Sequence, residues 1–523
     1  MSDKHYDVIV LGASLGALAT AALLARRDFN VLVLGQGARP ADYQFRDWKL
    51  RRRCFTPLCA TSPTLHKVLA ELAQAQVFRR KLVDLDPMLT ILLPDRRFEM
   101  APDLALLQAE MDREYPEVRR LIDDLYSEIT RVNAAADSAF DLDLCWPPQG
   151  ILQSLQARAA IASLPYTRGD EASLFGAFPP NHPYVEIVKE SAYCASHLAS
   201  TVRDLPRFAI ARLHGAWTRG PQGMPAGEDA MTAFFTERIC AFGGEMRLSE
   251  RVVGINALGK DTHRLVLDDA GTVLGATFVV SDGTGEALAH LAQGKGITRS
   301  AQRHWPVVTE PAGRFTVSLV VNREAVAQPL GAESLVFPRM PGSPPDALLP
   351  TIHLQRIDGD VMADEALQSL ATTLLVAEIR LSQPCPLALS EAREAVVSML
   401  MQHFPFLDKH LLAVDSTHDG LPVWVYDNGK RRTVDRIEAH GSMRGPEPMV
   451  PVLQVDPPGF LGLAGEPFRG PLARSFLTGR SVFPSLGQEG ELLAAWSIAK
   501  TITGTDKRKA RMRRDMWSRI EFG

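Results

Sequence analysis

Residues 6–36 read YDVIVLGASLGALATAALLARRDFNVLVLGQ, and this stretch decides the fold. A short apolar run, a turn of small residues, a helical pattern rich in alanine and leucine, and a second apolar run follow one another. That order predicts a strand, a turn, a helix and a parallel strand. A βαβ unit of this kind opens doubly wound domains, in which the amide groups at the start of the helix hold a dinucleotide.

The turn before the predicted helix departs from the usual dinucleotide fingerprint, G-x-G-x-x-G/A. Gly12 fills the first position and Ala17 the third, but Ser14 stands at the second. A serine adds a side chain where the backbone has to approach phosphate closely, although its hydroxyl can donate a hydrogen bond to a phosphate oxygen. The residues expected to form the dinucleotide site are Gly12, Ser14, Leu15, Gly16 and Ala17.

The end of the second predicted strand shows another departure. Dinucleotide-binding proteins place an acidic residue there, and its carboxylate bonds the adenosine ribose. This chain has Gly35 followed by Gln36, both of which are expected beside the cofactor. Loss of the charged contact costs about 1.5–3 kcal/mol, so binding requires that the other contacts remain. The alternative is that the βαβ unit only begins a parallel sheet.

Length and composition set the broad class. A chain of 523 residues with 46% hydrophobic and 23% charged residues is typical of a globular protein with two domains. The net charge of −4 gives no reason to expect nucleic acid as a partner. Six scattered cysteines without a C-x-x-C pair favour reduced thiols and no metal site. Because no apolar run is long enough to span a membrane and no signal peptide is present, a cytoplasmic protein is expected.

Three later segments follow the opening turn in a recognisable order. Residues 79–116 predict a strand pair, a helix and an acidic-aromatic-Pro turn. Residues 225–257 predict a small-residue turn, an amphipathic helix and a Gly-Gly pair before a strand, and residues 475–502 a strand, a glycine-containing loop and a long helix. Together with the opening turn, this series resembles the FAD-dependent amine oxidase superfamily, and within it the phytoene desaturases and carotenoid isomerases, with a degenerate FAD fingerprint.

The resemblance implies further contacts with FAD. The main chain at Val252 matches the position that contacts adenine in the family. Gly487 and Gly490 permit a tight loop that exposes amides at the start of the last helix. Where the family often has Gly-Asp, this chain has Gly479 and Arg480. The arginine either contacts the cofactor, by pairing with a phosphate or by replacing the ribityl contact, or is a surface residue. Glu489 and Glu491 in the first helical turn either lie near the cofactor or only complement the helix dipole.

The family's Arg-x-Gly-Gly-Arg segment after the second strand is missing. A basic cluster stands in its place: Arg46, Lys49, Arg51, Arg52 and Arg53. Such a cluster either holds the phosphates of the cofactor or forms a solvated face, which is the more common fate of a charge run.

Catalytic motifs are absent from the sequence. No H-E-x-x-H, G-x-S-x-G or P-loop pattern occurs, which argues against metalloproteases, serine hydrolases and P-loop enzymes. Desaturases of the resembled family transfer hydride to flavin in a dry apolar pocket, so strong acids and bases are not needed. The polar candidates are Arg212, His214 and Arg219, in ARLHGAWTRG. The alternative is that His214 is a buried, hydrogen-bonded histidine beside the core residue Trp217.

The expected fold is α/β, with a Rossmann-like FAD-binding domain that carries a three-stranded meander and a second, α+β substrate domain roofed by a mostly antiparallel sheet. The FAD-binding domain is expected to comprise residues 1–75, 211–299 and 456–505, and the substrate domain residues 76–210 and 300–455. An apolar tunnel between sheet and helices is expected to hold the substrate.

The last residues, 506–523, predict a basic amphipathic helix. Met512, Met516 and Ile520 are four residues apart, and basic residues surround them. Such a helix can lie on an anionic lipid surface, which would make the protein peripheral on the inner face of the membrane. The alternative is that the apolar stripe packs on the protein itself or on a second subunit, which leaves a homo-oligomer open.

Three functions compete at this point. The first is an FAD-dependent desaturase, dehydrogenase or isomerase acting on a hydrophobic polyene, isoprenoid or lipid-like molecule by hydride transfer to flavin. The second is a flavoprotein-like scaffold that has lost FAD and serves as a binding or assembly protein, as the exceptions at Ser14, Gly35 and Arg480 suggest. The third, a nicotinamide-dependent reductase, leaves the C-terminal segment unexplained.

Overall fold

The computed structural model describes residues 4–505 apart from residues 163, 167–173, 200–204, 259–261, 268–270, 327–329, 339–349, 360–371, 385–386, 428 and 437–444. The expected basic helix at 506–523 lies outside the described residues. Within the described part of the chain, no helix combines the length and the apolar character that a membrane crossing requires.

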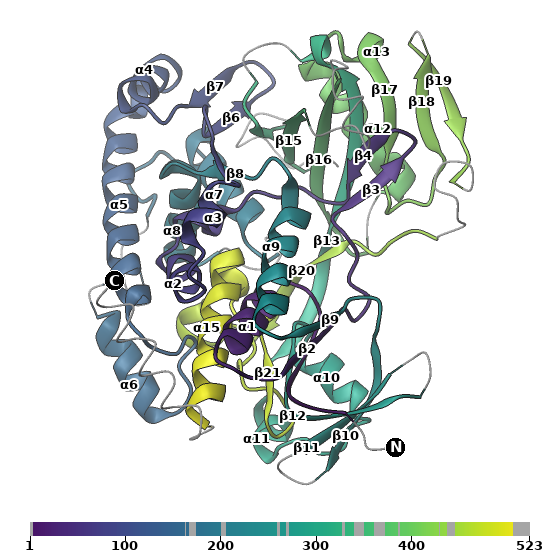
Figure 1. Ribbon diagram of the computed structural model, residues 1–523. Helices are drawn as coiled ribbons and strands as arrows, with labels where there is room; N and C mark the ends of the chain where they lie inside the picture. Colours follow the sequence, from purple (N-terminus) through teal and green to yellow (C-terminus); the bar gives the residue numbers. More distant parts are fainter. Residues whose placement is uncertain are drawn as a thin grey trace.

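The first sheet is built on the N-terminal βαβ unit and lies at the bottom of the view in Figure 1. Its strand order is β10-β11-β12-β1-β2-β9, and β21 pairs with β12. The strands β9, β2, β1, β12 and β21 are parallel, whereas β10, β11 and β12 form an antiparallel meander. The predicted Rossmann-like sheet with its meander is therefore confirmed. Its strands are β1 (His5–Leu11), β2 (Val31–Leu34), β9 (Glu245–Arg247), β10 (Val252–Leu258), β11 (Thr262–Leu267), β12 (Val273–Ser281) and β21 (Ser475–Leu477).

Helix α1 (Leu15–Arg26) is buried on all sides. Every residue from 16 to 25 is buried, because the helix packs against the sheet, α9 (Gly227–Ala241) and α15 (Gly487–Thr505). Small side chains make this possible. A Cβ added to Gly16 would lie 2.4 Å from the carbonyl oxygen of Thr478, so only glycine allows the close approach of these segments.

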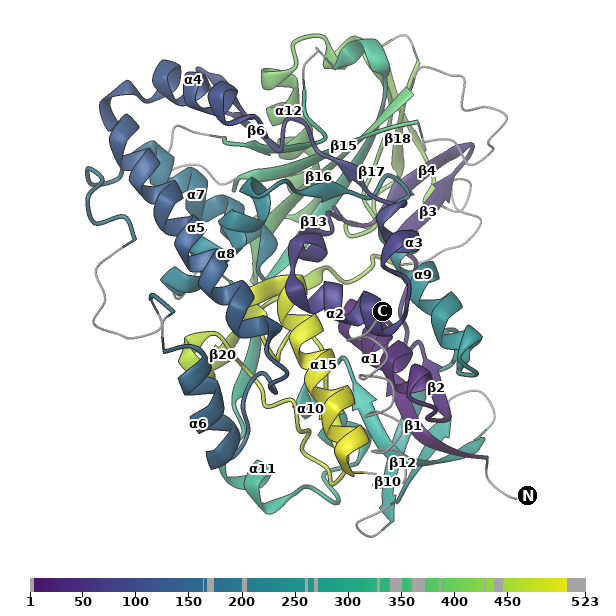
Figure 2. The same cartoon turned by 60° about the vertical axis from the view of Figure 1, so that its left-hand side comes forward.

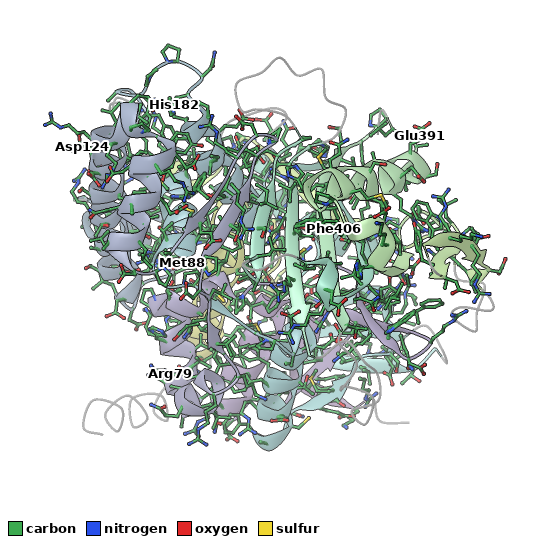
Figure 3. The ribbon with its side chains drawn as sticks, turned by 90° about the horizontal axis from the view of Figure 1, so that it is seen from above. Arg79, Met88, Asp124, His182, Glu391 and Phe406 are labelled. Carbon is green, nitrogen blue, oxygen red and sulfur yellow. The ribbon has the colours of Figure 1, made fainter. Side chains whose placement is uncertain are left out.

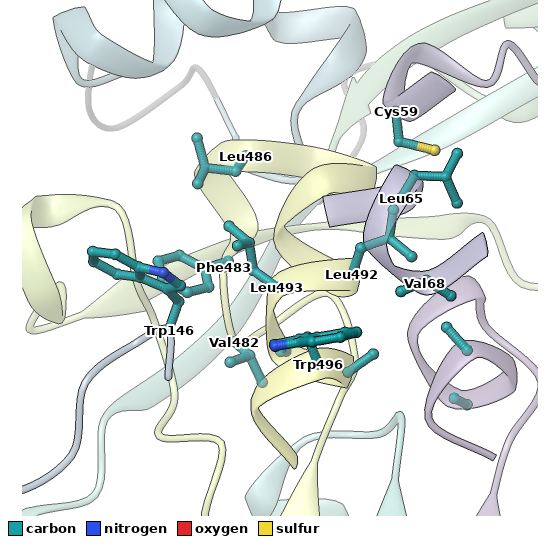
Figure 4. Close-up of a cluster of buried hydrophobic side chains, with 14 of the residues drawn as sticks. Cys59, Leu65, Val68, Trp146, Val482, Phe483, Leu486, Leu492, Leu493 and Trp496 are labelled. Carbon is teal, nitrogen blue, oxygen red and sulfur yellow. The ribbon is translucent and has the colours of Figure 1, made fainter. Parts of the chain in front are cut away.

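Helix α15 also packs on α2 (Pro63–Glu71), and Figure 4 shows the apolar cluster between them. Leu65 and Val68 on α2 face Leu492 and Trp496 on α15. All four side chains are at least 98% buried. The C-terminal helix is thus part of the same hydrophobic core as the N-terminal βαβ unit.

The second sheet is larger and mostly antiparallel, as predicted. Its order is β19-β18-β17-β13-β16-β15-β14-β6-β7, and β20 pairs with β13. The pair β14 and β6 is parallel and the other neighbours are antiparallel. Its strands are β6 (Leu89–Leu92), β7 (Arg97–Met100), β13 (Val307–Asn322), β14 (Glu333–Val336), β15 (Ile352–Asp358), β16 (Thr372–Ser382), β17 (Leu411–Asp415), β18 (Val423–Asp427), β19 (Lys430–Val434) and β20 (Val450–Asp456).

Different elements cover the two faces of the large sheet. Helices α12 (Leu389–His403) and α13 (Leu407–His410) pack on one face. A hairpin of β3 (Asp42–Phe45) and β4 (Trp48–Arg51) packs Phe45 and Leu50 on the other. The hairpin lies in segment 1–75, which the sequence predicts to be part of an FAD-binding domain, and its apolar side chains are buried against the large sheet.

A helical layer forms the left side of Figure 1 and comes forward in Figure 2. Its long helix α5 is amphipathic, because Ile122, Leu125, Ile129 and Val132 recur every three or four residues and are buried. From above, Asp124 on α5 and His182 before α7 lie opposite Glu391 on α12 (Figure 3). The remaining helices are α3 (Ala75–Arg79), α4 (Leu104–Glu114), α5 (Arg119–Asp141), α6 (Ile151–Ala160), α7 (Pro183–Ala195), α8 (Arg207–Thr218), α10 (Gly285–Leu291) and α11 (Arg299–His304). The short strands β5 (Val83–Asp84) and β8 (Gln222–Gly223) pair with each other.

Candidate functional site

A cavity of about 130 Å³ lies between the two sheets, at the start of α1 and α15. Its walls combine the turn before α1, at the first sheet, with strands β13, β15 and β16 of the large sheet. Residues 53–62 and helices α7 and α8 complete them. The apolar tunnel that the sequence predicts for the substrate stays a prediction. Five arginines and four glutamates line the cavity beside its apolar side chains: Arg53, Arg212, Arg219, Arg314, Arg480, Glu228, Glu378, Glu489 and Glu491.

On the helical side, Arg212 forms a two-pronged ion pair with Glu489. The Arg212 Nε and Nη2 atoms donate to the two carboxylate oxygens at 2.7 and 2.6 Å, and Ser62 Oγ donates to the same carboxylate at 2.6 Å. Both charged side chains are more than 90% buried. Although burial alone would raise it, the pKa of Glu489 is held below its ordinary value by the charge of Arg212. Arg219 at the end of α8 pairs with Asp137 at 2.8 Å.

On the sheet side, Arg314 of β13 pairs with Glu378 of β16. Arg314 Nη1 donates to the carboxylate at 2.6 Å, and Nη2 donates to the carbonyl oxygens of Cys194 and Ser196 at 3.1 and 2.7 Å. Arg314 therefore joins the large sheet to the end of α7. Arg53 and Glu228, which also line the cavity, pair with each other.

Arg480 differs from the other charged residues that line the cavity. It lies in the turn between β21 and α15, is partly buried, and has no hydrogen bond or ion pair with any described residue. Burial lowers the pKa of Arg480, and the neighbouring charge of Glu491 opposes this effect. An arginine nevertheless stays protonated in proteins, so the cavity contains a guanidinium without a counter-charge in contact.

The turn at the start of α1 is where the sequence predicts a pyrophosphate, and carboxylates of the chain itself occupy its amides. Gly16 N donates to Glu491 Oε2 at 3.2 Å, and Ser14 N donates to Asp282 Oδ2 at 2.9 Å. Ser14 caps the helix, because its hydroxyl accepts from Ala17 N at 3.3 Å.

Glu491 is fixed in this position by a second contact. Its other carboxylate oxygen accepts from Nε2 of His197, which follows α7, at 3.0 Å. Burial opposes ionisation, but the His197 hydrogen bond and the charge of Arg480 lower the pKa of Glu491 below its ordinary value. Burial lowers the pKa of His197 as well. A neutral imidazole therefore donates to an ionised carboxylate at the end of α1 that the helix dipole makes positive.

Asp282 fills the space beside the first glycine of the turn. Gly12 has a φ of +108°, and a Cβ added to it would lie 1.9 Å from the Asp282 carboxylate. A glycine is therefore required at position 12 for two reasons: it adopts the positive φ, and it leaves room for the Asp282 carboxylate. Burial raises the pKa of Asp282, while the bonds from Ser14 oppose the increase.

The adenine end of the expected site is also occupied by the chain. The side-chain amide of Gln36 lies along the main chain of Val252: Gln36 Nε2 donates to the carbonyl oxygen at 2.8 Å, and Val252 N donates to Gln36 Oε1 at 2.9 Å. These two main-chain groups are those that the family resemblance assigns to the adenine ring. Gln36 adopts a positive φ of 51°, which turns its side chain back toward the strand.

The ribose position offers no room for the missing acid. A Cβ added to Gly35 would lie 1.9 Å from the carbonyl oxygen of Leu248. Any side chain at position 35, acidic or not, would therefore require the backbone near residue 248 to move.

These contacts test whether the residues present fit FAD, and they do not fit it. Pyrophosphate oxygens would have to displace Asp282 and Glu491 from the amides and then lie beside two carboxylates. A repulsion between unit charges 4 Å apart is about 1 kcal/mol in water and about 4 kcal/mol near a protein surface. Adenine would have to displace Gln36 from Val252. The amides of Ser14 and Gly16 and the main chain of Val252 are thus already used by side chains of the protein.

The structure brings some of the sequence-predicted residues together and separates others. Ser14, Leu15, Arg212, Arg219, Arg480 and Glu491 line the cavity. Gly487 has a φ of 54° where the chain enters α15, and Gly490 lies in the first turn of this helix, where a Cβ would be 2.4 Å from the carbonyl oxygen of Phe483. A Cβ added to Gly479 would likewise lie 1.8 Å from the carbonyl oxygen of Asp282.

His214 lies outside the cavity lining. It is fully buried on α8, and its ring nitrogens lie 2.7 Å from Ser191 Oγ and 3.2 Å from the hydroxyl of Tyr126. Burial lowers the pKa of His214 to about 3. Trp217 Nε1 donates to the carbonyl oxygen of Ser191 at 3.0 Å in the same packed region. His214 is therefore a buried, neutral and hydrogen-bonded histidine of the core, which is the alternative given for it from the sequence.

The basic cluster after the second strand is used within the protein. Arg51 pairs with Asp42, and Arg52 Nε donates to Glu447 at 2.8 Å. Lys49 also pairs with Asp42, at 3.2 Å. Lys49 and Arg51 therefore pair with Asp42 within the β3–β4 hairpin, and Arg52 joins the end of the hairpin to Glu447.

Sequence reasoning missed His197, Arg314 and Glu378. Arg314 directly precedes the mostly apolar run 315–321 of β13, and Glu378 directly follows the apolar run 374–377 of β16. A charge beside such a run is the signal that could have identified them. His197 follows α7 in a short irregular segment and carries no such signal.

Comparison with protein-family models gives no match, and comparison with curated proteins gives none either. Solved structures do match most of the chain. An oxidoreductase from Methanosarcina mazei is similar with a TM-score of 0.57 and 15% identity, covering 94% of this chain and 99% of its own. A triple mutant of putrescine oxidase, described as a redesign of cofactor binding, is similar with a TM-score of 0.55 and 13% identity, covering 96% of this chain and 99% of its own. The chain therefore has the fold of the amine oxidase-like flavoproteins.

Proposed function

We propose that this chain is a binding protein on a flavoprotein fold, which does not hold FAD in the dinucleotide site of that fold and takes a small ligand in the cavity between its two sheets. The observation that carries the proposal is the occupation of the dinucleotide site by Gln36, Asp282 and Glu491. Each of these side chains bonds a main-chain group that FAD would need.

The competing function is the one that the sequence resemblance implies, an FAD-dependent desaturase or isomerase of a hydrophobic polyene. The amine oxidase-like fold favours it. The charged lining of the cavity opposes it, because an apolar hydrocarbon would leave Arg480 buried without a partner. The occupied adenosine diphosphate site opposes it a second time.

The absorption spectrum of the purified chain separates the two functions. We expect no flavin band in the native protein and none in the supernatant after denaturation. Isothermal titration of the protein with FAD should give no saturable heat. A flavoprotein of known FAD content, handled in parallel, controls for cofactor loss during purification. A yellow preparation with FAD in the supernatant would contradict the proposal.

A single substitution tests whether Glu491 keeps phosphate groups away from the start of α1. Glu491→Ala removes the acceptor from Gly16 N and leaves a small residue in the first turn of α15. Inorganic phosphate is the probe, because it requires only the helix amides. We expect phosphate to bind the variant more tightly than the wild type, and no gain for Glu110→Ala, which changes an exposed ion pair.

A further inference from the structure

One charged side chain among the described lining residues of the cavity makes no hydrogen bond or ion pair. Arg212 pairs with Glu489, Arg219 with Asp137, and Arg314 with Glu378. Arg53 pairs with Glu228, and the Glu491 carboxylate accepts a hydrogen bond from the neutral His197 ring. Only Arg480 remains without a hydrogen bond or ion pair. A partly buried guanidinium is costly unless an anion or water satisfies its donors.

We propose that Arg480 binds the carboxylate of a small organic monoanion in this cavity. The inference rests on the proposed function, because a bound flavin would compete for the same space. A guanidinium presents two parallel N–H donors that match the two oxygens of a carboxylate. The guanidinium of Arg480 has donors without a partner among the described residues, and a ligand carboxylate can accept hydrogen bonds from them.

The other arginines of the cavity are already paired with carboxylates, and those carboxylates already accept hydrogen bonds. Both oxygens of Glu491 already accept hydrogen bonds, from Gly16 N and from His197. Glu489 and Glu378 are likewise engaged by arginines. A second anionic group on the ligand would have to break one of these buried pairs, which disfavours a dianion.

The size and the remaining walls of the cavity define the rest of the ligand. A volume of about 130 Å³ accommodates on the order of ten non-hydrogen atoms. Apolar side chains make up much of the lining: Leu15, Phe55, Leu58, Leu213, Val450 and Leu486. A short aliphatic carboxylate, with its chain on these residues and its head on Arg480, satisfies both the charge and the apolar surface.

Calorimetric titration of the full chain with hexanoate tests the assignment. We expect saturable binding to the wild type and an affinity about tenfold or more lower for Arg480→Gln, since a charge-assisted two-pronged bond is lost. Arg431→Gln is the matched control, because Arg431 pairs with Glu394 on the surface and should bind hexanoate as the wild type does. Hexanamide, which has the same chain without the charge, should bind at least tenfold more weakly than hexanoate.

Three results overturn the assignment: no hexanoate binding to an FAD-free wild type, equal affinity of the wild type and Arg480→Gln, or tighter binding of inorganic phosphate than of hexanoate. If Arg480→Gln fails to fold by circular dichroism, Arg480→Lys replaces it. The lysine keeps the charge and loses the fork, so hexanoate should bind several-fold more weakly, and unchanged affinity contradicts the proposal. FAD in the same preparation would instead refute the proposed function, so the two failures are distinguishable.

Discussion

At the scale of single residues, Gln36 shows how a side chain can take the place of a cofactor's base. Its amide presents a donor and an acceptor side by side, and both meet the main chain of Val252. Val252 is fully buried, so its N–H and carbonyl groups need partners in the folded protein. Gln36 at the end of β2 therefore has a structural role that does not depend on a ligand.

Replacing Gln36 by alanine should destabilise the protein. The change leaves two buried main-chain groups of Val252 without their partners, and we expect the free energy of unfolding to fall by about 1–3 kcal/mol. Urea unfolding followed by circular dichroism measures this. Gln44→Ala, which removes an exposed bond to the Arg46 carbonyl oxygen, should stay within about 0.5 kcal/mol of the wild type. Equal effects of the two substitutions would argue against the role of Gln36.

His214 should make the stability depend on pH. Its pKa is about 3 in the folded chain because of burial, and about 6.5 when unfolded. The unfolded state therefore binds more protons between these values, and the free energy of unfolding falls as pH falls through this window. From about pH 7 to about pH 5, this residue alone should remove about 2 kcal/mol.

Urea unfolding of His214→Asn at the two pH values isolates this contribution. The variant should lose less stability on acidification than the wild type does, by about 2 kcal/mol, whatever its stability at neutral pH. His304→Asn changes an exposed histidine and should keep the wild-type dependence. An unchanged pH dependence in His214→Asn would mean that the folded chain protonates this histidine normally.

At the scale of elements, the first turn of α15 joins several parts of the fold. Glu489 reaches Arg212 on α8 and Ser62 before α2, while Glu491 reaches the start of α1 and His197 after α7. Both carboxylates are about 95% buried. Their role is thus not limited to complementing the helix dipole, because each closes a contact between distant segments.

Removing the charge of Glu489 should be strongly destabilising. Glu489→Gln leaves Arg212 buried with Asp137 as its remaining ion-pair partner, and breaking one side of a buried pair costs about 3–5 kcal/mol. Glu394→Gln breaks an exposed pair with Arg431 and should cost less than about 1 kcal/mol. Thermal and urea unfolding of the two variants give the comparison, and a loss below about 1 kcal/mol for Glu489→Gln would contradict the assigned role.

The elements themselves were largely predictable from the sequence. The apolar runs around Gly12 and the small residues of the first helix specify a βαβ unit through local periodicity. The segment 79–116 has the predicted strand pair, helix and Tyr115-Pro116 turn. What local patterns do not specify is which polar side chain meets which amide, and the roles of Asp282 and Glu491 depend on that.

At the scale of the whole molecule, the candidate site is formed by contacts between residues far apart in the chain. Glu491 and Gly16 are separated by 475 positions, Glu489 and Arg212 by 277, and Gln36 and Val252 by 216. No periodicity reports such pairs. The sequence therefore predicts the scaffold and the departures of its fingerprint, whereas the occupants of the dinucleotide site emerge only from the folded chain.

Thiol labelling can test how tightly the two halves of the molecule close over the cavity. Cys54 lies 3.4 Å from the Val376 carbonyl oxygen on β16, and the carbonyl of Cys194 accepts from Arg314 on β13. Burial raises the pKa of Cys194 to about 12 and that of Cys54 well above its ordinary value. Because the thiolate is the reactive form, both should react slowly while the halves are together.

In a Cys385→Ser background, a chromogenic disulfide reagent should label one thiol rapidly, the exposed Cys240. Adding Cys240→Ser should remove this fast phase. The remaining thiols should react only at the rate at which the structure opens, and labelling should become complete in denaturant. A second thiol that reacts as fast as Cys240 in the native protein, identified as Cys54 or Cys194 by mass spectrometry, would mean that the halves separate readily and that the cavity is open to solvent. The contacts of Arg314 with Glu378 and with the carbonyl groups of Cys194 and Ser196 predict the opposite, since opening at this point would break a buried ion pair and two hydrogen bonds.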